Sequence, residues 1–285
     1  MERVMKQALH RKDDILDLIV RQLGTVPIDY ADTFDLIRKK RKSDKTWLAA
    51  GVLLPLFFRE NPDDGGGGEF LFQLIKRSSS VPQGGDLSGP GGMLSPMPDR
   101  FFSTLIGTGI LPTLNGRARS YVRKRDSASQ RTIRLFFANA LRESWEEIGL
   151  NPLNVELLGP IPSYSLSLFT RTIFPLVGLV KREWNFRPNW EVEKVVEIPL
   201  KSLFENDSYG ILSLEALDER DNCTYYRDLP CLIHSDMDGK EEVLWGATLA
   251  IILSFLKIVF NYDPSTKNER RVIKRTLRPG YITGK

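Results

Sequence analysis

Cysteine and histidine are scarce in this chain, with two residues of each type among 285. Cys223 and Cys231 do not have the spacing of metal ligands, and two cysteines do not suggest a disulfide framework. His10 and His234 are isolated in the sequence, so we interpret both as surface residues. The sequence therefore indicates neither a cysteine-rich metal site nor a disulfide-stabilised fold, and a reducing compartment, the cytoplasm, is the default expectation.

Long hydrophobic runs are absent as well. The longest apolar stretch, 244–260, is interrupted by Lys257 and is shorter than the ~20 residues that a bilayer span requires. The N-terminal sequence MERVMKQALHRKDD lacks the apolar core of a signal peptide. We therefore expect a buried helix at 244–260 and no membrane span.

The net charge is small, +4, so no general nucleic-acid role is implied and no nucleic-acid partner is expected. Basic residues gather in three local runs, at 38–42, 117–125 and 267–275. Such runs are usually solvated surface and less often bind phosphate. The composition, 41% hydrophobic and 27% charged, is typical of a soluble globular protein.

Helical and extended patterns alternate along the chain, which predicts an α/β or α+β fold. Helical spacing predicts helices at 8–23, 131–149 and 241–260, and Gly149 stands where a helix C-cap glycine belongs. Strands are predicted at 46–58, 69–78, 155–165 and 171–183, and another at 195–199 leads into a short helix. Turn formers predict a hairpin loop at 59–68 and loops at 81–99 and 184–195.

The segment ALRESWEEIGL, 140–150, crowds three glutamates beside Arg142. Glu146 and Glu147 lie three and four positions after Glu143, so on a helix all three carboxylates project from one side. The other side is apolar and is expected to anchor the helix in the core through Leu141, Trp145 and Ile148.

Two interpretations of the glutamates stand at this point. Like charges at this spacing repel by only about 0.2–0.5 kcal/mol per pair, so an ordinary solvated face is energetically acceptable. A hard divalent cation would reverse the sign of the interaction, because Mg²⁺ takes oxygen ligands and is often shared with substrate phosphates. One of the carboxylates could then act as a base.

The order R-E-x-x-E-E-x-G-L at 142–150 resembles the core of the Nudix box, Gly-x5-Glu-x7-Arg-Glu-U-x-Glu-Glu-x-Gly-U, in which U is apolar. The segment PGGML at 90–94 is similar to the glycine pair that opens the box. The resemblance implies an α/β/α sandwich with a mixed sheet. It also implies hydrolysis of a diphosphate linked to another moiety, with Mg²⁺ or Mn²⁺ held by the glutamate helix.

Further segments resemble the coenzyme A pyrophosphatase branch of this superfamily. They are LIKRSSSVPQGGDLSGPGG, NALRESWEEIGL, RPNWEVEKVVEIPLKSLF and LWGATLAIIL, which occur in the branch's order over residues 70–256. Within the first segment, the matching residues are Lys76, Arg77, Ser78, Gly85, Ser88, Pro90, Gly91 and Gly92. This resemblance implies coenzyme A or one of its thioesters as the substrate.

The spacing inside the box departs from the family pattern. With five residues left between them, the glutamate position that follows Gly92 falls on Pro98, and Asp99 is one position later. Counting back from Arg142 places the first glutamate position at Arg134. An insertion at about 96–130, in the loop before the helix, accounts for both mismatches, and extra loop length costs little closure entropy.

Two interpretations of the insertion stand. Its apolar half packs either on the domain or on a second copy of the chain, as in a homodimer. Its basic half is either a solvated decoration or a lid that closes over an anionic substrate. The basic residues are Arg117, Arg119, Arg123, Lys124 and Arg125.

On the resemblance, Glu146 and Glu147 are metal ligands, and Glu143 is a third ligand or the residue that orients water. Arg142 is expected to hold the helix geometry by pairing with a carboxylate. Glu191 is either a further ligand or base, or an exposed loop acid.

The strand end and the glycine loop each have two interpretations. Gly91 and Gly92 form a plain turn, or they offer a carbonyl to the metal or an amide to phosphate. Lys76 and Arg77 bind phosphate, or they are a charged strand end.

The sequence thus predicts a helical extension at 1–45, a Nudix hydrolase domain at 46–262 and a basic tail at 263–285. The expected partner is a small nucleotide substrate. The alternatives are hydrolysis of another dinucleotide, such as NADH or ADP-ribose, and a nucleotide-binding module without catalysis.

Overall fold

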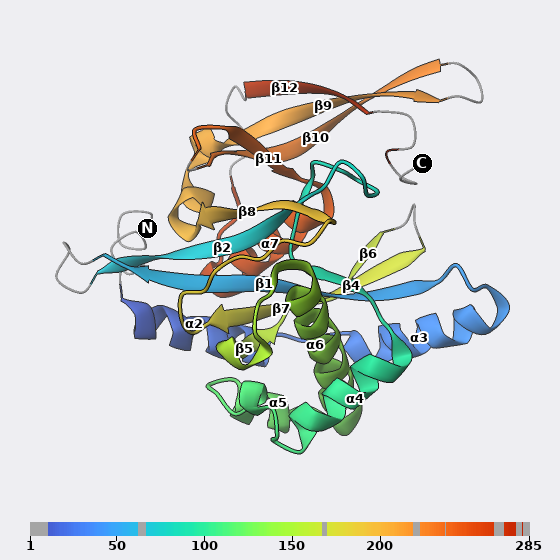
Figure 1. Cartoon of the computed structure of the whole chain (residues 1–285), viewed down its shortest axis with the longest axis vertical. Coiled ribbons are helices and arrows are strands. Elements are labelled where there is room, and N and C mark those ends of the chain that lie inside the picture. Colours follow the sequence, from blue (N-terminus) through green and yellow to red (C-terminus); the bar gives the residue numbers. More distant parts are fainter. Residues whose placement is uncertain are drawn as a thin grey trace.

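The computed structural model describes residues 11–61, 67–166, 170–218, 223–236, 238–264, 271–277 and 281. The fold is α+β, with an eight-stranded sheet between helices and a separate four-stranded sheet (Figure 1). Within the described ranges, no helix is both long and apolar enough to cross a bilayer. The predicted fold class is therefore confirmed.

The large sheet is mixed, as predicted. Its order is β3-β2-β1-β7-β5, with β4 added to β1, β6 to β7 and β8 to β2. β1 and β7 run parallel, while the other strand pairs are antiparallel. The bounds are β1 Leu48–Glu60, β2 Gly68–Arg77, β3 Leu87–Ser88, β4 Gly91–Met93, β5 Val155–Pro160, β6 Tyr164–Leu166, β7 Arg171–Val180 and β8 Val192–Pro199.

Helices cover both faces of this sheet. Successive side chains of β1 point to opposite faces, so β1 contributes to a core cluster on each side. Leu54 and Leu56 join a core cluster with helices α2 and α7. Leu53 and Phe57 join a second cluster with α3 and α6. The helices are α2 Lys12–Thr25, α3 Tyr30–Ser43, α4 Pro96–Gly107, α5 Arg119–Lys124, α6 Ser127–Ile148 and α7 Gly246–Phe260. The short 3₁₀ turns are Pro112–Leu114, Pro152–Asn154, Leu200–Phe204 and Asn206–Ser208.

The small sheet was not predicted. Its order is β11-β10-β9-β12, with bounds β9 Tyr209–Asp218, β10 Cys223–Ser235, β11 Glu241–Trp245 and β12 Arg271–Leu277. The predicted helix at 241–260 therefore begins only at Gly246. The predicted basic tail contains β12, which pairs with β9 because Ile273 and Leu277 pack against Leu212 beneath the charged residues.

The predicted loops contain more regular structure than expected. The 81–99 stretch includes β3, β4 and the start of α4, while half of the 59–68 hairpin loop, 62–66, lies outside the described residues. β8 begins at Val192, inside the loop predicted at 184–195. The 96–130 segment is not a loop but contains α4, α5 and the first turn of α6.

Two arginines of the basic segment are bound to α2 rather than free to act as a lid. The Arg117 guanidinium pairs with Asp13 at 2.7 Å and with Asp17 at 2.8 Å. One nitrogen of Arg125 donates to the carbonyls of Leu23, Gly24 and Val26, each at 3.0 Å. These contacts do not agree with the lid interpretation for Arg117 and Arg125, which fasten the 96–130 segment to α2, Arg117 near its start and Arg125 at its C-terminal end.

The Arg125 contacts predict a stability effect. Arg125→Gln removes the charged donor from three carbonyls at the C-terminal end of α2, where a cation is favoured. Because a hydrogen bond to a charged group contributes about 1.5–3 kcal/mol, we expect the free energy of unfolding to fall by about 1–3 kcal/mol. Urea titration followed by circular dichroism measures the change. The exposed Arg123→Gln is the control, and an equal effect in both variants would contradict the assignment.

Candidate metal-binding carboxylate site

The glutamates project from α6, whose two ends are capped. At the N-terminus, the Asp126 side chain accepts hydrogen bonds from the amides of Ala128 and Ser129, both at 2.9 Å. At the C-terminus, Gly149 adopts a left-handed conformation with φ of 75°, which confirms the predicted cap. These caps fix where the helix ends relative to the carboxylates.

The apolar side of α6 anchors the helix to the large sheet. Leu141 and Ile148 are fully buried, as predicted. Phe136 stacks on Phe174 of β7 with ring centroids 3.8 Å apart. Trp145 is 53% exposed, so its predicted core position is wrong. Buried side chains along the helix, from Ile133 to Ile148, therefore hold α6 in the core without Trp145.

The glycine pair lies against the glutamates, with no room for larger residues. A Cβ at Gly92 would lie 2.6 Å from the carboxyl carbon of Glu143, and a Cβ at Gly91 would lie 2.3 Å from the carbonyl oxygen of Gly51. The Gly91 amide donates to the Glu147 carboxylate at 2.9 Å. The missing side chains thus let β4 approach α6 at Gly92 and β1 at Gly91, and the Gly91 amide binds a glutamate of the site itself.

Arg142 links two of the glutamates to a buried aspartate. Its guanidinium lies 2.7 Å from oxygens of Asp99, Glu143 and Glu146. Burial alone would lower the pKa of Arg142, but hydrogen bonding to Asp99 and the charge of Glu143 outweigh it and raise the pKa above its ordinary value. The predicted pairing of Arg142 with a carboxylate is confirmed, and its arrangement fixes the orientation of Glu143.

Asp99 and Asn139 complete this network, and we did not predict a role for either. Asp99 has no exposed surface and accepts hydrogen bonds from the Ser95 amide at 2.6 Å and from Asn139 at 3.0 Å. The Asn139 oxygen accepts from the Gly51 amide of β1 at 2.7 Å. The box spacing could have indicated Asp99, because it lies one position after the place where the box has its first glutamate. No sequence pattern indicated Asn139, an asparagine on an apolar helix face.

Glu147 is the most buried of the three glutamates, with 4% of its surface exposed. The pKa of Glu147 is raised to about 8, chiefly by burial, with the charges of Glu143 and Glu191 acting in the same direction and the Gly91 amide and Arg77 opposing them. Burial likewise raises the pKa of Glu143, although Arg142 opposes the shift. A bound cation would stabilise the ionised forms of Glu143 and Glu147 in place of their protons.

Glu191 and Arg77 lie close enough to act electrostatically on Glu147. The loop before Glu191 is fastened to the end of α6, because the Asn189 amide donates to the Glu147 carbonyl at 2.8 Å. The Glu191 carbonyl in turn accepts from the Ser78 amide at 2.8 Å, just after Arg77. The structure thus brings Glu191 and Arg77 to the same side as the glutamate face.

Lys76 points elsewhere. Its ammonium pairs with Glu193 at 3.3 Å and with the buried Glu242 at 3.1 Å. The register of β2 with β8 shifts between Lys76 and Arg77, at this end of the strand. For Lys76, the charged strand end is the interpretation that agrees with its contacts.

The donor set suits a hard divalent cation that retains water. The available ligands are carboxylate oxygens, which Mg²⁺ and Mn²⁺ prefer. Within the described ranges, no three Asp, Glu, His or Cys side chains already stand together as a closed metal site. Arg142 draws Glu143 and Glu146 toward itself while Gly91 holds Glu147. Such an open arrangement fits Mg²⁺, which is commonly bound through one or two carboxylates together with substrate phosphates.

Comparison with solved structures finds only distant likenesses. An Ap4A hydrolase from C. elegans, in a binary complex, is 12% identical, with a TM-score of 0.34 over 55% of this chain and 84% of the other. A NUDIX hydrolase from Alicyclobacillus acidocaldarius is 13% identical, with a TM-score of 0.35 over 55% and 81%. The NUDIX domain of Shewanella oneidensis NrtR, complexed with ADP ribose, is 15% identical, with a TM-score of 0.31 over 57% and 79%. At these scores the likenesses carry no argument about function.

Sequence comparison is more informative. No family model matches the chain. A curated protein of Pectobacterium atrosepticum, the uncharacterized Nudix hydrolase NudL, is 33% identical over 129 residues. The match covers 44% of this chain and 59% of NudL, so the chain spans about three fifths of the length of that relative. This likeness supports the Nudix hydrolase superfamily as the family that the chain resembles.

Proposed function

We propose that this protein is a Nudix-type hydrolase that cleaves a diphosphate bond in a nucleoside-diphosphate-linked compound, using Mg²⁺ or Mn²⁺. The observation that supports the proposal most directly is the approach of β4 to α6, where Gly92 lies against the Glu143 carboxyl group and the Gly91 amide donates to Glu147. The insertion at about 96–130 is part of the proposal, and Asp99, near its start, reaches Arg142 of α6.

Each residue of the site has a role that follows from its surroundings. Glu146 and Glu147 are the proposed ligands, and Glu143 completes the set or orients the attacking water. A divalent ion bound there would polarise phosphoryl oxygens and acidify a water molecule. Arg142 keeps Glu143 and Glu146 on one side through its two ion pairs. Glu191 supplies the second candidate for proton transfer, and Arg77 supplies positive charge for a phosphate.

Coenzyme A or a derivative is the proposed substrate. The support is the order of the four sequence segments that resemble the coenzyme A pyrophosphatase branch. We further propose that the protein acts in the cytoplasm. We propose that 1–45 and 263–285 are extensions of a domain at 46–262. We also propose a homodimer that forms through the apolar part of the insertion.

The test is incubation of purified protein with coenzyme A and Mg²⁺ or Mn²⁺, with products identified by mass. We expect 4′-phosphopantetheine and 3′,5′-ADP, which balance coenzyme A plus one water. Glu146→Gln removes a ligand charge while its side chain, 52% exposed, leaves the fold intact, and we expect a loss of at least about 10²-fold in kcat. Glu183→Gln, at an exposed position, is the matched control and should retain full activity.

Other outcomes distinguish the alternatives. Turnover of NADH or ADP-ribose, but not coenzyme A, would keep the hydrolase and reject the substrate. Nucleotide binding without turnover of any of these compounds, with either metal, would reject catalysis and favour a binding module.

A further inference from the structure

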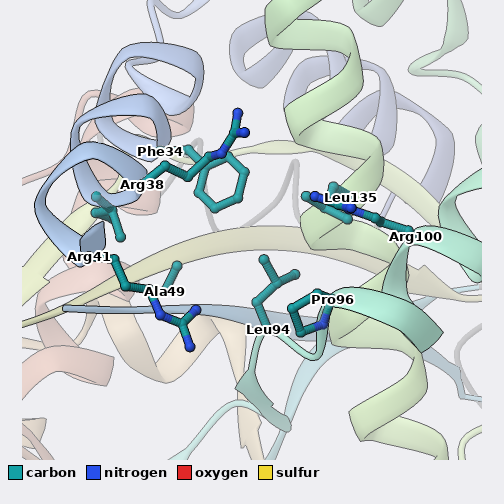
Figure 2. A pocket seen from close by; sticks show the side chains of 9 residues that line it. Phe34, Arg38, Arg41, Ala49, Leu94, Pro96, Arg100 and Leu135 are labelled. Carbon is teal, nitrogen blue, oxygen red and sulfur yellow. The ribbon is translucent and has the colours of Figure 1, made fainter. Parts of the chain in front are cut away.

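A hollow of about 160 Å³ lies between α3, the start of β1, the segment joining β4 to α4, and α6 (Figure 2). It shares no residue with the carboxylate site. The residues that line it are Phe34, Ile37, Arg38, Arg41, Ala49, Leu94, Pro96, Arg100 and Leu135.

The floor of the hollow is apolar. Phe34 and Leu94 are partly buried against the core cluster of α3 and α6, and Ala49 of β1 is buried within it. The hollow's volume is close to that of the engineered 150 Å³ apolar cavity that accepts benzene. An occupant of the floor would therefore have an apolar body about the size of one ring.

Three arginines and no acidic residue line the hollow. Arg38 and Arg41 are three positions apart on α3 and therefore share one face, while Arg100 enters from α4 on the other side (Figure 2). Arg38 makes only a 3.5 Å contact with Asp35, and both side chains are mostly exposed. Within the described residues, neither Arg41 nor Arg100 forms an ion pair, so their charge is available to a ligand.

We propose that this hollow is a second binding site, for a small amphipathic anion. The ligand has a ring-sized apolar body on the Phe34, Ala49 and Leu94 floor and one phosphate or carboxylate, toward which the exposed side chains of Arg41 and Arg100 turn on binding. A guanidinium presents donors in a planar fork that matches both groups. Apolar contact and charge act together, so neither half of the ligand alone suffices. The proposal does not depend on the hydrolase activity.

The test is calorimetric titration of the whole protein with phenyl phosphate, in EDTA so that no metal contributes. We expect a Kd on the order of 0.1 mM, the range that a ligand of this size reaches. Inorganic phosphate, which lacks the ring, and benzyl alcohol, which lacks the charge, should each bind at least about tenfold more weakly. Phenylacetate then distinguishes carboxylate from phosphate as the preferred anion.

Two double variants locate the binding. Arg41→Gln with Arg100→Gln should weaken phenyl phosphate binding at least about tenfold. Arg123→Gln with Lys124→Gln makes the same change in net charge on α5 and should leave the affinity unchanged. Equal affinities in both double variants, no binding by the wild type, or inorganic phosphate binding as tightly as phenyl phosphate would each overturn the proposal.

Discussion

Asp99→Ala is expected to lower the free energy of unfolding by about 3–5 kcal/mol, the usual cost of removing one partner from a buried ion pair. Asp99 is completely buried and lies 2.7 Å from Arg142, whose side chain is 11% exposed. The substitution also removes the acceptor of the Ser95 amide and of Asn139. Urea unfolding followed by circular dichroism measures the loss.

The control is Asp35→Ala, because Asp35 is exposed and its contact with Arg38 is 3.5 Å long. We expect a change below about 1 kcal/mol for this pair. A loss below about 1 kcal/mol for Asp99→Ala would contradict the structural role of this pair.

Glu147→Gln is expected to stabilise the metal-free protein at alkaline pH while removing a proposed metal ligand. Burial raises the pKa of Glu147 from 4.5 to about 8, so the folded state keeps a proton that the unfolded chain releases. Stability from this group is fully present below about pH 4.5 and is lost as the pH rises through about 8. Glutamine does not titrate, and its carbonyl oxygen can still accept from the Gly91 amide.

The size of this effect follows from the shift. At about 1.4 kcal/mol per pKa unit, the ionised carboxylate costs at most about 5 kcal/mol, and relaxation reduces this to about 2–4 kcal/mol. We therefore expect Glu147→Gln and wild type to unfold alike at pH 5 and to differ by this amount at pH 9, in EDTA. Glu183→Gln, at an exposed site, is the control. A constant difference across this pH range would refute the assigned pKa shift.

Much of the carboxylate site is local in sequence, and that part was predictable. Glu143, Glu146 and Glu147 share a face because the helical period places residues three and four apart together. Gly149 marked the end of the same helix, and its left-handed conformation is the one that glycine adopts most easily.

The errors of prediction have equally particular causes. Trp145 is an apolar residue, but no element in the described part of the chain covers its position on α6. β12 lies in a basic run, and its strand character depends on β9, which precedes it by about 60 residues. Arg117 and Arg125 belong to a charge run that resembles a lid, yet their partners lie on α2, about a hundred residues earlier.

The amino-acid sequence by itself determined the α6 carboxylate face, the glycine pair and the alternating direction of the apolar β1 side chains. Each of these depends on spacing within one element. Only the tertiary structure decided that Asp99 pairs with Arg142, 43 positions away, and that Gly91 binds Glu147, 56 positions away. It also decided that Arg41 and Arg100 line one hollow. These contacts depend on how the sheet and helices pack, and local spacing carries no information about which distant groups that packing brings together.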